Sequence, residues 1–181
     1  MNELTLRERL AWFAGIIDGE GSVGAYWTNR GANAKKGNPP SLVFLVTIGN
    51  TDIRMIEAMT QIADELGLKY GVCKRKWPAG FKSMWVLTFA GWNRVEGILT
   101  HVLPFLVCKR EKADIVLAMI RHRRSTWRIK ARNARGQVAG MSSVIDDSWL
   151  MEQLDHLRSL NKTGMVTNPV SGSESGGEKE T

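Results

Sequence analysis

Residues Leu10–Ser22 read LAWFAGIIDGEGS, an apolar run that ends in two acids, Asp18 and Glu20, in a stretch with three glycines. One interpretation is an ordinary core helix with a glycine-rich exit, in which Asp18 caps a turn and Glu20 lies in solvent, and the spacing alone favours it. The alternative is that the segment delivers two carboxylates to a functional site. The rest of the chain has to decide between the two.

The residues before this stretch predict where its helix begins. Thr5 and Glu8 have the spacing of a capping box, so we expect a helix from about Leu6 to Asp18, ended by the glycines that follow. One face of this helix carries very small side chains at i, i+4 and i+8, namely Ala11, Gly15 and Gly19. Another backbone can approach such a stripe closely, and the remaining circumference is apolar, so the helix is expected to be buried on more than one side.

The pattern beyond the first helix predicts an alternation of hairpins and helices. Period-two runs indicate strands, apolar positions at helical spacing indicate helices, and Gly or Pro clusters separate them. Asn50 or Thr51 is expected to cap the second helix, which Gly67 ends. The expected elements are strands 22–29 and 41–49, a helix over 53–66, strands 68–76 and 82–90, and helices over 92–107, 109–124 and up to Leu160, the last one capped by Asp146 or Asp147.

Composition narrows the class of protein. A chain of 181 residues with 43% hydrophobic content predicts one domain, residues 1–162, and the Gly/Ser/Glu-rich residues 163–181 predict a disordered tail. The net charge of +7 makes a polyanionic partner plausible, although ordinary solvated surfaces are also basic. The sequence has no membrane-length apolar run, signal peptide or paired-cysteine motif, so we expect a soluble intracellular protein, in the cytoplasm or an organelle matrix.

The nine residues Phe13–Gly21, FAGIIDGEG, resemble the signature of the LAGLIDADG homing endonucleases. The αββαββα order is also that family's fold, and the resemblance extends to Asn50–Asp52 and to Leu103–Leu106 before Lys109, covering about Leu10–Arg124. It implies an α+β protein with a curved antiparallel sheet as a DNA-binding saddle, plus C-terminal helices.

The resemblance also implies the catalytic chemistry. Glu20 would coordinate a divalent metal with the backbone carbonyl of Gly19, while Asp18 would stabilise the turn. Mg²⁺ suits oxygen ligands of this kind, and Ca²⁺ can occupy such sites without supporting cleavage. Asn50, Arg54 and Lys109 would surround the scissile phosphate, although Asn50 can equally cap a helix, and Arg54 and Lys109 can be ordinary surface residues.

A single copy of the motif occurs, so two metal-binding acids require two chains. The stripe of Ala11, Gly15 and Gly19 would then pack against its symmetry mate and bring both copies of Glu20 together. Such a homodimer predicts a near-palindromic DNA target.

Strand alternation divides the side chains between the two faces of the sheet, and the resemblance implies that the parity of Gly24, Tyr26 and Thr28 points into the major groove. Trp85, Leu87 and Phe89 are expected on the core face of the second hairpin. Lysines would contact phosphates, while Tyr26, Thr28, Arg30 and Asn38 would read base edges. The orientation of the second strand is ambiguous, because the residues that would face DNA with Ser41 and Thr47 include the apolar Val43 and Leu45. A solvated charged hairpin is the alternative. The expected DNA-binding set is Gly24, Tyr26, Thr28, Asn29, Arg30, Lys35, Lys36, Asn38, Ser41, Val43, Thr47, Lys74, Lys76 and Lys82.

A basic connector, 121–135, with seven Lys or Arg, is expected to touch the DNA backbone outside the core site. The leading hypothesis is therefore a homodimeric, Mg²⁺-dependent homing endonuclease that makes a double-strand break in a long DNA target by water attack on phosphate. An RNA maturase or a cleavage-inactive DNA-binding regulator on the same fold is the alternative. A basic α+β structural protein would leave the acid-ended helix unexplained.

Overall fold

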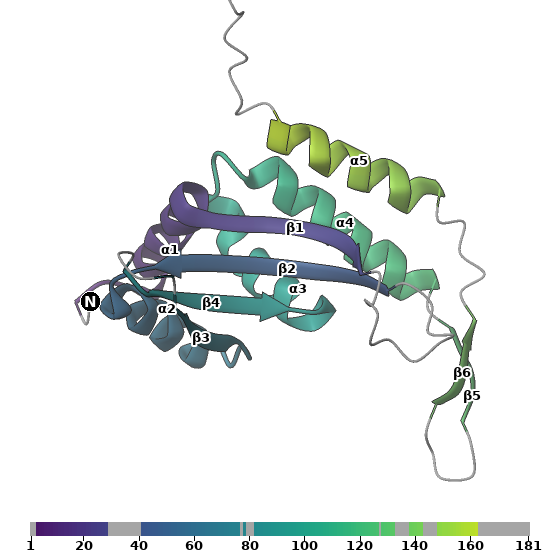
Figure 1. The fold of residues 1–181 in the computed structure, drawn as a ribbon, viewed down its shortest axis with the longest axis horizontal. Helices are drawn as coiled ribbons and strands as arrows, with labels where there is room; N and C mark the ends of the chain where they lie inside the picture. The colour runs from purple at the N-terminus through teal and green to yellow at the C-terminus, as the bar shows by residue number, and fades with distance from the viewer. Residues whose placement is uncertain are drawn as a thin grey trace, which may run out of the picture.

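The computed structural model describes residues 3–28, 41–76, 78, 82–126, 128–132, 138–142 and 148–162. Its elements follow the predicted αββαββα order and the two helices predicted after it, and add a small hairpin between those two helices (Figure 1). They are α1 (Leu6–Glu20), β1 (Gly21–Thr28), β2 (Ser41–Asn50), α2 (Ile53–Glu65), β3 (Gly71–Arg75), β4 (Met84–Ala90), α3 (Trp92–Val102), the 3-10 turn η1 (Leu103–Phe105), α4 (Arg110–Thr126), β5 (Arg128–Arg132), β6 (Val138–Ser142) and α5 (Ser148–Lys162).

The predicted capping box begins α1. The amide of Glu8 donates to Thr5 Oγ1 at 3.3 Å, and the amide of Thr5 donates to Glu8 Oε2 at 2.7 Å. The helix, however, continues two residues past its predicted end and includes Glu20. Glycine costs a helix only about 1 kcal/mol relative to alanine, so Gly19 does not stop it. The stop comes at Gly21, where a Cβ atom would lie 2.7 Å from the Ile17 carbonyl oxygen.

The start of α2 differs from the prediction in the identity of the cap. Asp52 is the N-cap, and its Oδ1 accepts the Arg54 amide at 3.0 Å. Asn50 instead ends β2, and its Oδ1 accepts the Asp52 amide at 2.8 Å. At the other end Leu66 is the C-cap residue, and the glycine after it, Gly67, adopts a left-handed φ of +66°, which glycine allows at little cost.

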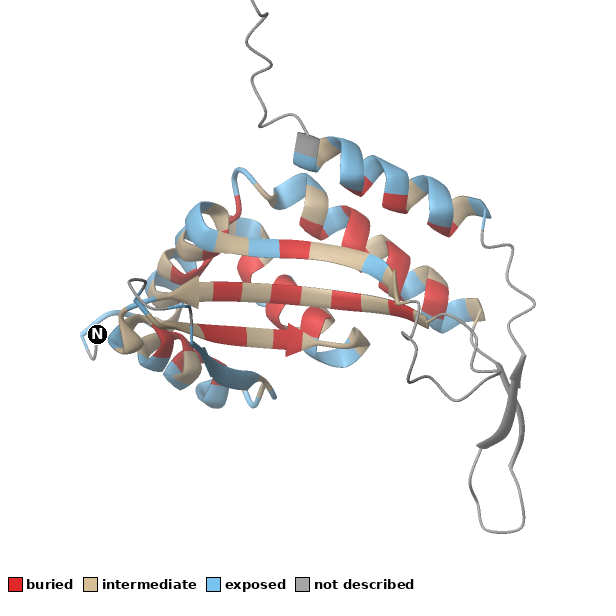
Figure 2. Cartoon of the chain, in the orientation of Figure 1, coloured by how far each residue is buried: buried red, intermediate tan, exposed pale blue. Residues whose placement is uncertain are grey.

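The first four strands form one antiparallel sheet in the order β1-β2-β4-β3, with the helices behind it (Figure 1). Along β2, buried and partly exposed residues alternate strictly (Figure 2). The buried set is Leu42, Phe44, Val46 and Ile48, so Ser41, Val43, Leu45 and Thr47 lie on the opposite, open face. The predicted parity of the ambiguous second strand is therefore confirmed.

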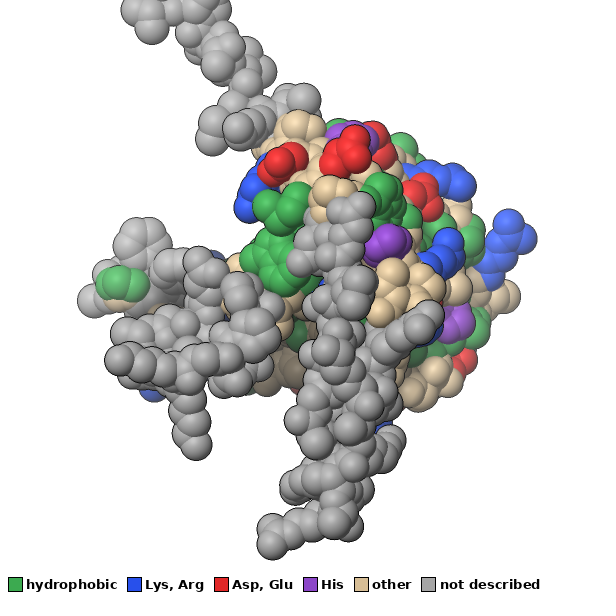
Figure 3. Space-filling model, turned by 90° about the vertical axis from the view of Figure 1, so that its right-hand side faces the viewer, with side chains coloured by type: hydrophobic (Ala, Val, Ile, Leu, Met, Phe, Trp, Pro, Cys, Tyr) green, Lys and Arg blue, Asp and Glu red, His purple; other side chains and the backbone are tan. Residues whose placement is uncertain are grey.

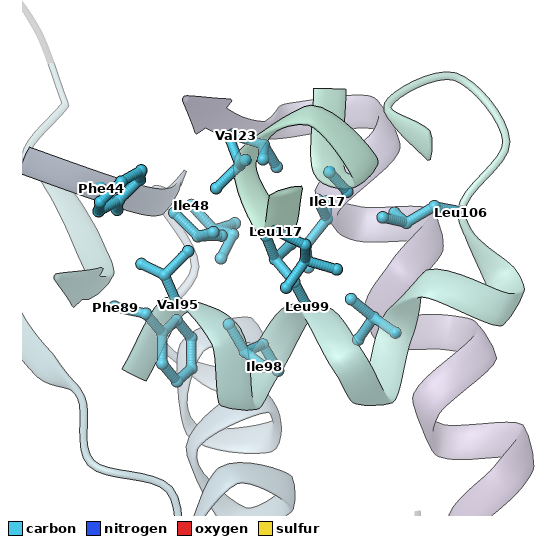
Figure 4. Packing of buried hydrophobic residues seen from close by; sticks show 14 of the residues in the cluster. Ile17, Val23, Phe44, Ile48, Phe89, Val95, Ile98, Leu99, Leu106 and Leu117 are labelled. Atoms are coloured by element: carbon cyan, nitrogen blue, oxygen red, sulfur yellow. The ribbon is translucent and has the colours of Figure 1, made fainter. Parts of the chain in front are cut away.

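One hydrophobic cluster joins the covered face of the sheet to the helices (Figure 4). Phe44, Ile48 and Phe89 project from the sheet toward Val95 and the rest of α3. Of the predicted core face of β4, Leu87 and Phe89 are fully buried and Trp85 packs partly buried against the cluster. The same cluster extends from Leu10 to Leu157, which makes α5 part of its packing.

The region after α4 is more regular than the predicted basic connector. The helix itself takes up residues 121–126, and β5 pairs with β6 as an antiparallel hairpin. The expected caps Asp146 and Asp147, and the predicted tail 163–181, lie outside the described residues. The boundary of the domain at residue 162 stays a prediction. None of the helices in the described part of the chain is long and apolar enough to cross a membrane.

We expect Leu154→Ala to lower the free energy of unfolding by about 2–5 kcal/mol, because Leu154 of α5 is only 1% exposed within the common cluster. Met151→Ala, on the same helix but 41% exposed, serves as the control and should have a smaller effect. Urea unfolding followed by fluorescence and by circular dichroism measures both. Two separate transitions would contradict a single domain that includes α5.

Candidate active site and nucleic-acid interface

The predicted metal-binding acid lies where the end of α1 meets the end of β2. β1 follows Glu20 directly and pairs antiparallel with β2, Gly21 opposite Ile48, so the last residues of β2 return to the helix end. There Asn50 Nδ2 donates a hydrogen bond of 3.0 Å to Glu20 Oε2. The structure thus brings together two of the four predicted catalytic side chains.

Lys109 joins the same helix end through Asp18. The Asp18 carboxylate accepts the amide of Val107 at 2.7 Å and the amide of Lys109 at 2.8 Å, while Lys109 Nζ donates to the Asp18 carbonyl oxygen. Lys109 is half-buried, and this burial lowers the pKa of its ammonium group. The prediction for Asp18 was stabilisation of its own turn. The structure shows that its carboxylate also binds the backbone of the segment that leads into α4.

Arg54 is connected to the same hydrogen-bond network through Asp52. Its guanidinium group pairs with Asp52, with an Nη2–Oδ2 distance of 2.5 Å, and the Asp52 amide is bonded to Asn50. Hydrogen bonds from Arg54 lower the pKa of Asp52 to about 2. With 84% of its side chain exposed, Arg54 can leave this ion pair for an external anion at modest cost.

The donor atoms at this point suit a hard cation. Glu20 and Gly19 are exposed, and the Gly19 carbonyl is one of the last four of α1, which have no helical partner and carry partial negative charge. A carboxylate and a carbonyl oxygen are the ligand types that Mg²⁺ and Ca²⁺ take, so the residues present fit such an ion. In the part of the chain that the structure describes, no three His, Cys, Asp or Glu residues gather into a metal-binding group.

The small-residue stripe of α1 is open in the single chain. Ala11, Gly15 and Gly19 are all exposed, and a Cβ atom built on either glycine meets nothing within 4 Å. The opposite side of the helix is packed, with Phe13 and Ile17 at 0% exposure. Within a single chain α1 is therefore buried on one side. The expected burial of a second side stays a prediction, which depends on a second copy of the chain.

The open face of the sheet carries the predicted set from the first hairpin. Tyr26 pairs with Val43 and Thr28 with Ser41, so each pair shares this face. Of the predicted DNA-binding residues, the open face holds Gly24, Tyr26, Thr28, Ser41, Val43 and Thr47. Lys76 and Lys82 are exposed just beyond β3 and just before β4, and Asn29, Arg30, Lys35, Lys36 and Asn38 lie outside the described residues.

The second hairpin gives the position of Lys74, whose contact with DNA stays a prediction. Lys74 pairs with Trp85, on the helix-covered face, and its ammonium nitrogen lies 5.2 Å from the centroid of the Trp85 ring. Its neighbour Arg75 pairs with Met84 and lies on the open face, although it is not among the predicted DNA-binding residues. Charge alone could not distinguish Arg75 from Lys74. The face of each residue of β3 follows from its register with β4, in which Trp85 lies on the core face.

The sequence and the structure were each compared with known proteins, and the structure identifies the class of fold. No protein-family model and no curated protein matches the sequence. Among solved structures, the fold is that of the LAGLIDADG homing endonucleases, as the motif predicted.

The similar structures differ in how much of their own chain is matched. The homing endonuclease I-CvuI, in complex with its target in the presence of Ca, is 23% identical with a TM-score of 0.56, covering 86% of this chain and 83% of that one. The homing endonuclease I-TnaI is 15% identical with a TM-score of 0.50, covering 88% and 89%. I-GzeII, in complex with a DNA target, is 14% identical with a TM-score of 0.51, covering 82% of this chain but 43% of that one.

Proposed function

We propose that this chain is a site-specific homing endonuclease that acts as a homodimer and makes a double-strand break in a long, near-palindromic DNA target by metal-dependent phosphodiester hydrolysis. The observation that carries the proposal is the meeting of Glu20, Asn50 and Lys109 at the end of α1, where β1 begins and β2 ends. The similar folds of I-CvuI and I-GzeII, both in complex with DNA targets, support DNA as the partner.

Each residue of the site has a role that its contacts support. Glu20 and the Gly19 carbonyl would hold a divalent cation, which supplies an activated water and neutralises phosphate charge. Asn50, held between Glu20 and the Asp52 amide, has a fixed orientation and would position the attacking water. The Lys109 ammonium would stabilise the charge that develops on the phosphate, and Arg54 would bind the adjacent backbone.

The exposed stripe on α1 supports the proposed dimer. Two copies packed along Ala11, Gly15 and Gly19 about a two-fold axis would put both Glu20 residues side by side, because Glu20 directly follows the stripe. Most of this chain matches less than half of I-GzeII, so two copies together approach that longer chain in length. Each copy would then read one half-site.

The charge distribution favours the open sheet face over the α5 side as the site for DNA. Acidic side chains gather over α5 at the top of the view in Figure 3. Glu152 is an exposed acid of α5 and would repel phosphates, whereas the charge of Asp155 is offset by its ion pair with Arg158. The open face presents neutral side chains and Arg75 instead.

Cleavage of a randomised DNA library tests the proposal. With Mg²⁺ we expect double-strand cuts at a near-palindromic consensus, and with Ca²⁺ binding to the same sequence without cutting. Selective DNA binding without cutting in either ion would instead favour a cleavage-inactive regulator. Absence of any DNA preference would contradict both.

The two faces of β3 yield a matched pair of variants. Arg75→Ala should cost about 1–3 kcal/mol of binding on the cognate site and relax the preference at one position per half-site, because Arg75 lies on the open face. Lys74→Ala, one residue away, removes a cation stacked on Trp85 and should leave the preference unchanged. Binding titrations over single-base-substituted sites measure both, and equal effects of the two variants would argue against this orientation of the hairpin.

A further inference from the structure

Asp18 makes three hydrogen bonds to one short segment far away in the sequence. Its Oδ2 accepts the Val107 amide and its Oδ1 accepts the Lys109 amide, from residues 89 and 91 positions further along the chain. Its main-chain oxygen accepts Lys109 Nζ. Main chain and side chain of Lys109 are thus both attached to a single residue of α1.

The bond to the Lys109 amide is a helix cap supplied from another helix, while Val107 lies two residues ahead of Lys109, outside α4. The carbonyl of Lys109 accepts the Ala113 amide at 3.0 Å, so Lys109 stands at the start of α4. The first amides of a helix have no partner within it and carry partial positive charge, and a carboxylate is therefore a favourable acceptor there. Asp18 performs this role from the last turn of α1.

The position of Asp18 connects this cap to the candidate site. Asp18 lies two residues before Glu20 on the same helix, and Asn50 bonds Glu20 from the side of β2. A lysine side chain free in solvent would have to lose its rotamer freedom each time DNA bound. Held on α1, the ammonium group keeps its place relative to Glu20 before any substrate arrives.

We propose that Asp18 is a positioning residue for Lys109, which fixes the backbone and the ammonium group of that lysine on the helix turn that carries Glu20. This inference rests on the proposed endonuclease function for its consequence in catalysis. Asp18 is not assigned as a metal ligand here, because both its carboxylate oxygens already accept backbone N–H groups.

Asp18→Asn tests the role with a minimal change of shape. The amide oxygen of asparagine can accept one of the two N–H groups, but its NH₂ group would face the other. We expect kcat for cleavage to fall about 10- to 100-fold, the range typical of a misplaced catalytic group, while KM and DNA affinity in Ca²⁺ change less than about threefold. Thr5→Ala, which removes the cap at the opposite end of α1, is the matched control and should leave kcat unchanged.

A double-mutant cycle separates positioning from a merely structural effect. If Asp18 acts through Lys109, Asp18→Asn should cause no further loss of kcat in a Lys109→Ala background. An equal additional loss in that background, or a normal kcat in the single variant, would overturn the proposal.

Amide hydrogen exchange tests the contact without relying on cleavage. In Asp18→Asn the Val107 and Lys109 amides should exchange faster than in the parent chain, while the amides of α2 should not change. If the parent chain cuts no DNA, the proposed function fails and this measurement still decides whether Asp18 holds Lys109. Unchanged exchange at both amides would refute the attachment itself.

Discussion

Glu20→Gln is expected to abolish Mg²⁺-dependent cutting, by a factor of at least about 100, while DNA binding and dimerisation persist. The substitution removes the negative charge of the carboxylate that Asn50 contacts at the end of α1. It conserves shape, because the amide oxygen of glutamine can still accept the hydrogen bond that Asn50 Nδ2 donates to Glu20 Oε2. Folding of the exposed helix end should therefore be unaffected.

The measurement is a single-turnover cleavage rate, paired with DNA affinity in Ca²⁺. Glu57→Gln makes the same chemical change at an exposed position of α2 and should cut like the parent chain. If Glu20→Gln cleaves at the parental rate, Glu20 has no part in the mechanism. If it also loses DNA binding, the residue has a role beyond holding a metal ion.

Gly15→Leu is expected to convert the proposed dimer into monomers. In a single chain the leucine has room, since nothing lies within 4 Å of a Cβ atom at this position, and leucine is a better helix former than glycine. Any loss of dimerisation must therefore come from a clash between the leucine and the second copy of the chain. Overpacking costs about 1–3 kcal/mol per site, and the two-fold axis applies it twice, which raises the dimer Kd about 30-fold or more.

Sedimentation velocity over a range of concentrations measures this shift, and thermal unfolding checks that the monomer stays folded. Gly15→Ala, with a smaller side chain, should have an intermediate effect. Double-strand cutting should decline together with the dimer, because each chain contributes one Glu20. A normal dimer in Gly15→Leu would refute the interface proposed for α1.

Local signals in the sequence were sufficient for the order of the αββαββα elements and for the class of fold. The spacing of Thr5 and Glu8 predicted the start of α1 because a capping box involves neighbouring residues alone. The two faces of β2 were ambiguous in the sequence because Val43 and Leu45 of its open face are apolar, and the parity that the resemblance implied is the one that the structure has. The same motif-level information identified Glu20 and Asn50, which the structure joins by a hydrogen bond; their catalytic roles stay predictions.

Tertiary structure alone decided the features that depend on distant residues. β3 is exposed along its whole length, so no hydrophobic pattern reveals its faces, and its pairing with β4 put Lys74 over Trp85 and Arg75 on the open side. Gly19 resembled a helix stop, yet α1 continues to Glu20. The partners of Asp18 lie 89 and 91 residues away, and hydrogen bonds across such separations exist only once α1 and α4 have packed together.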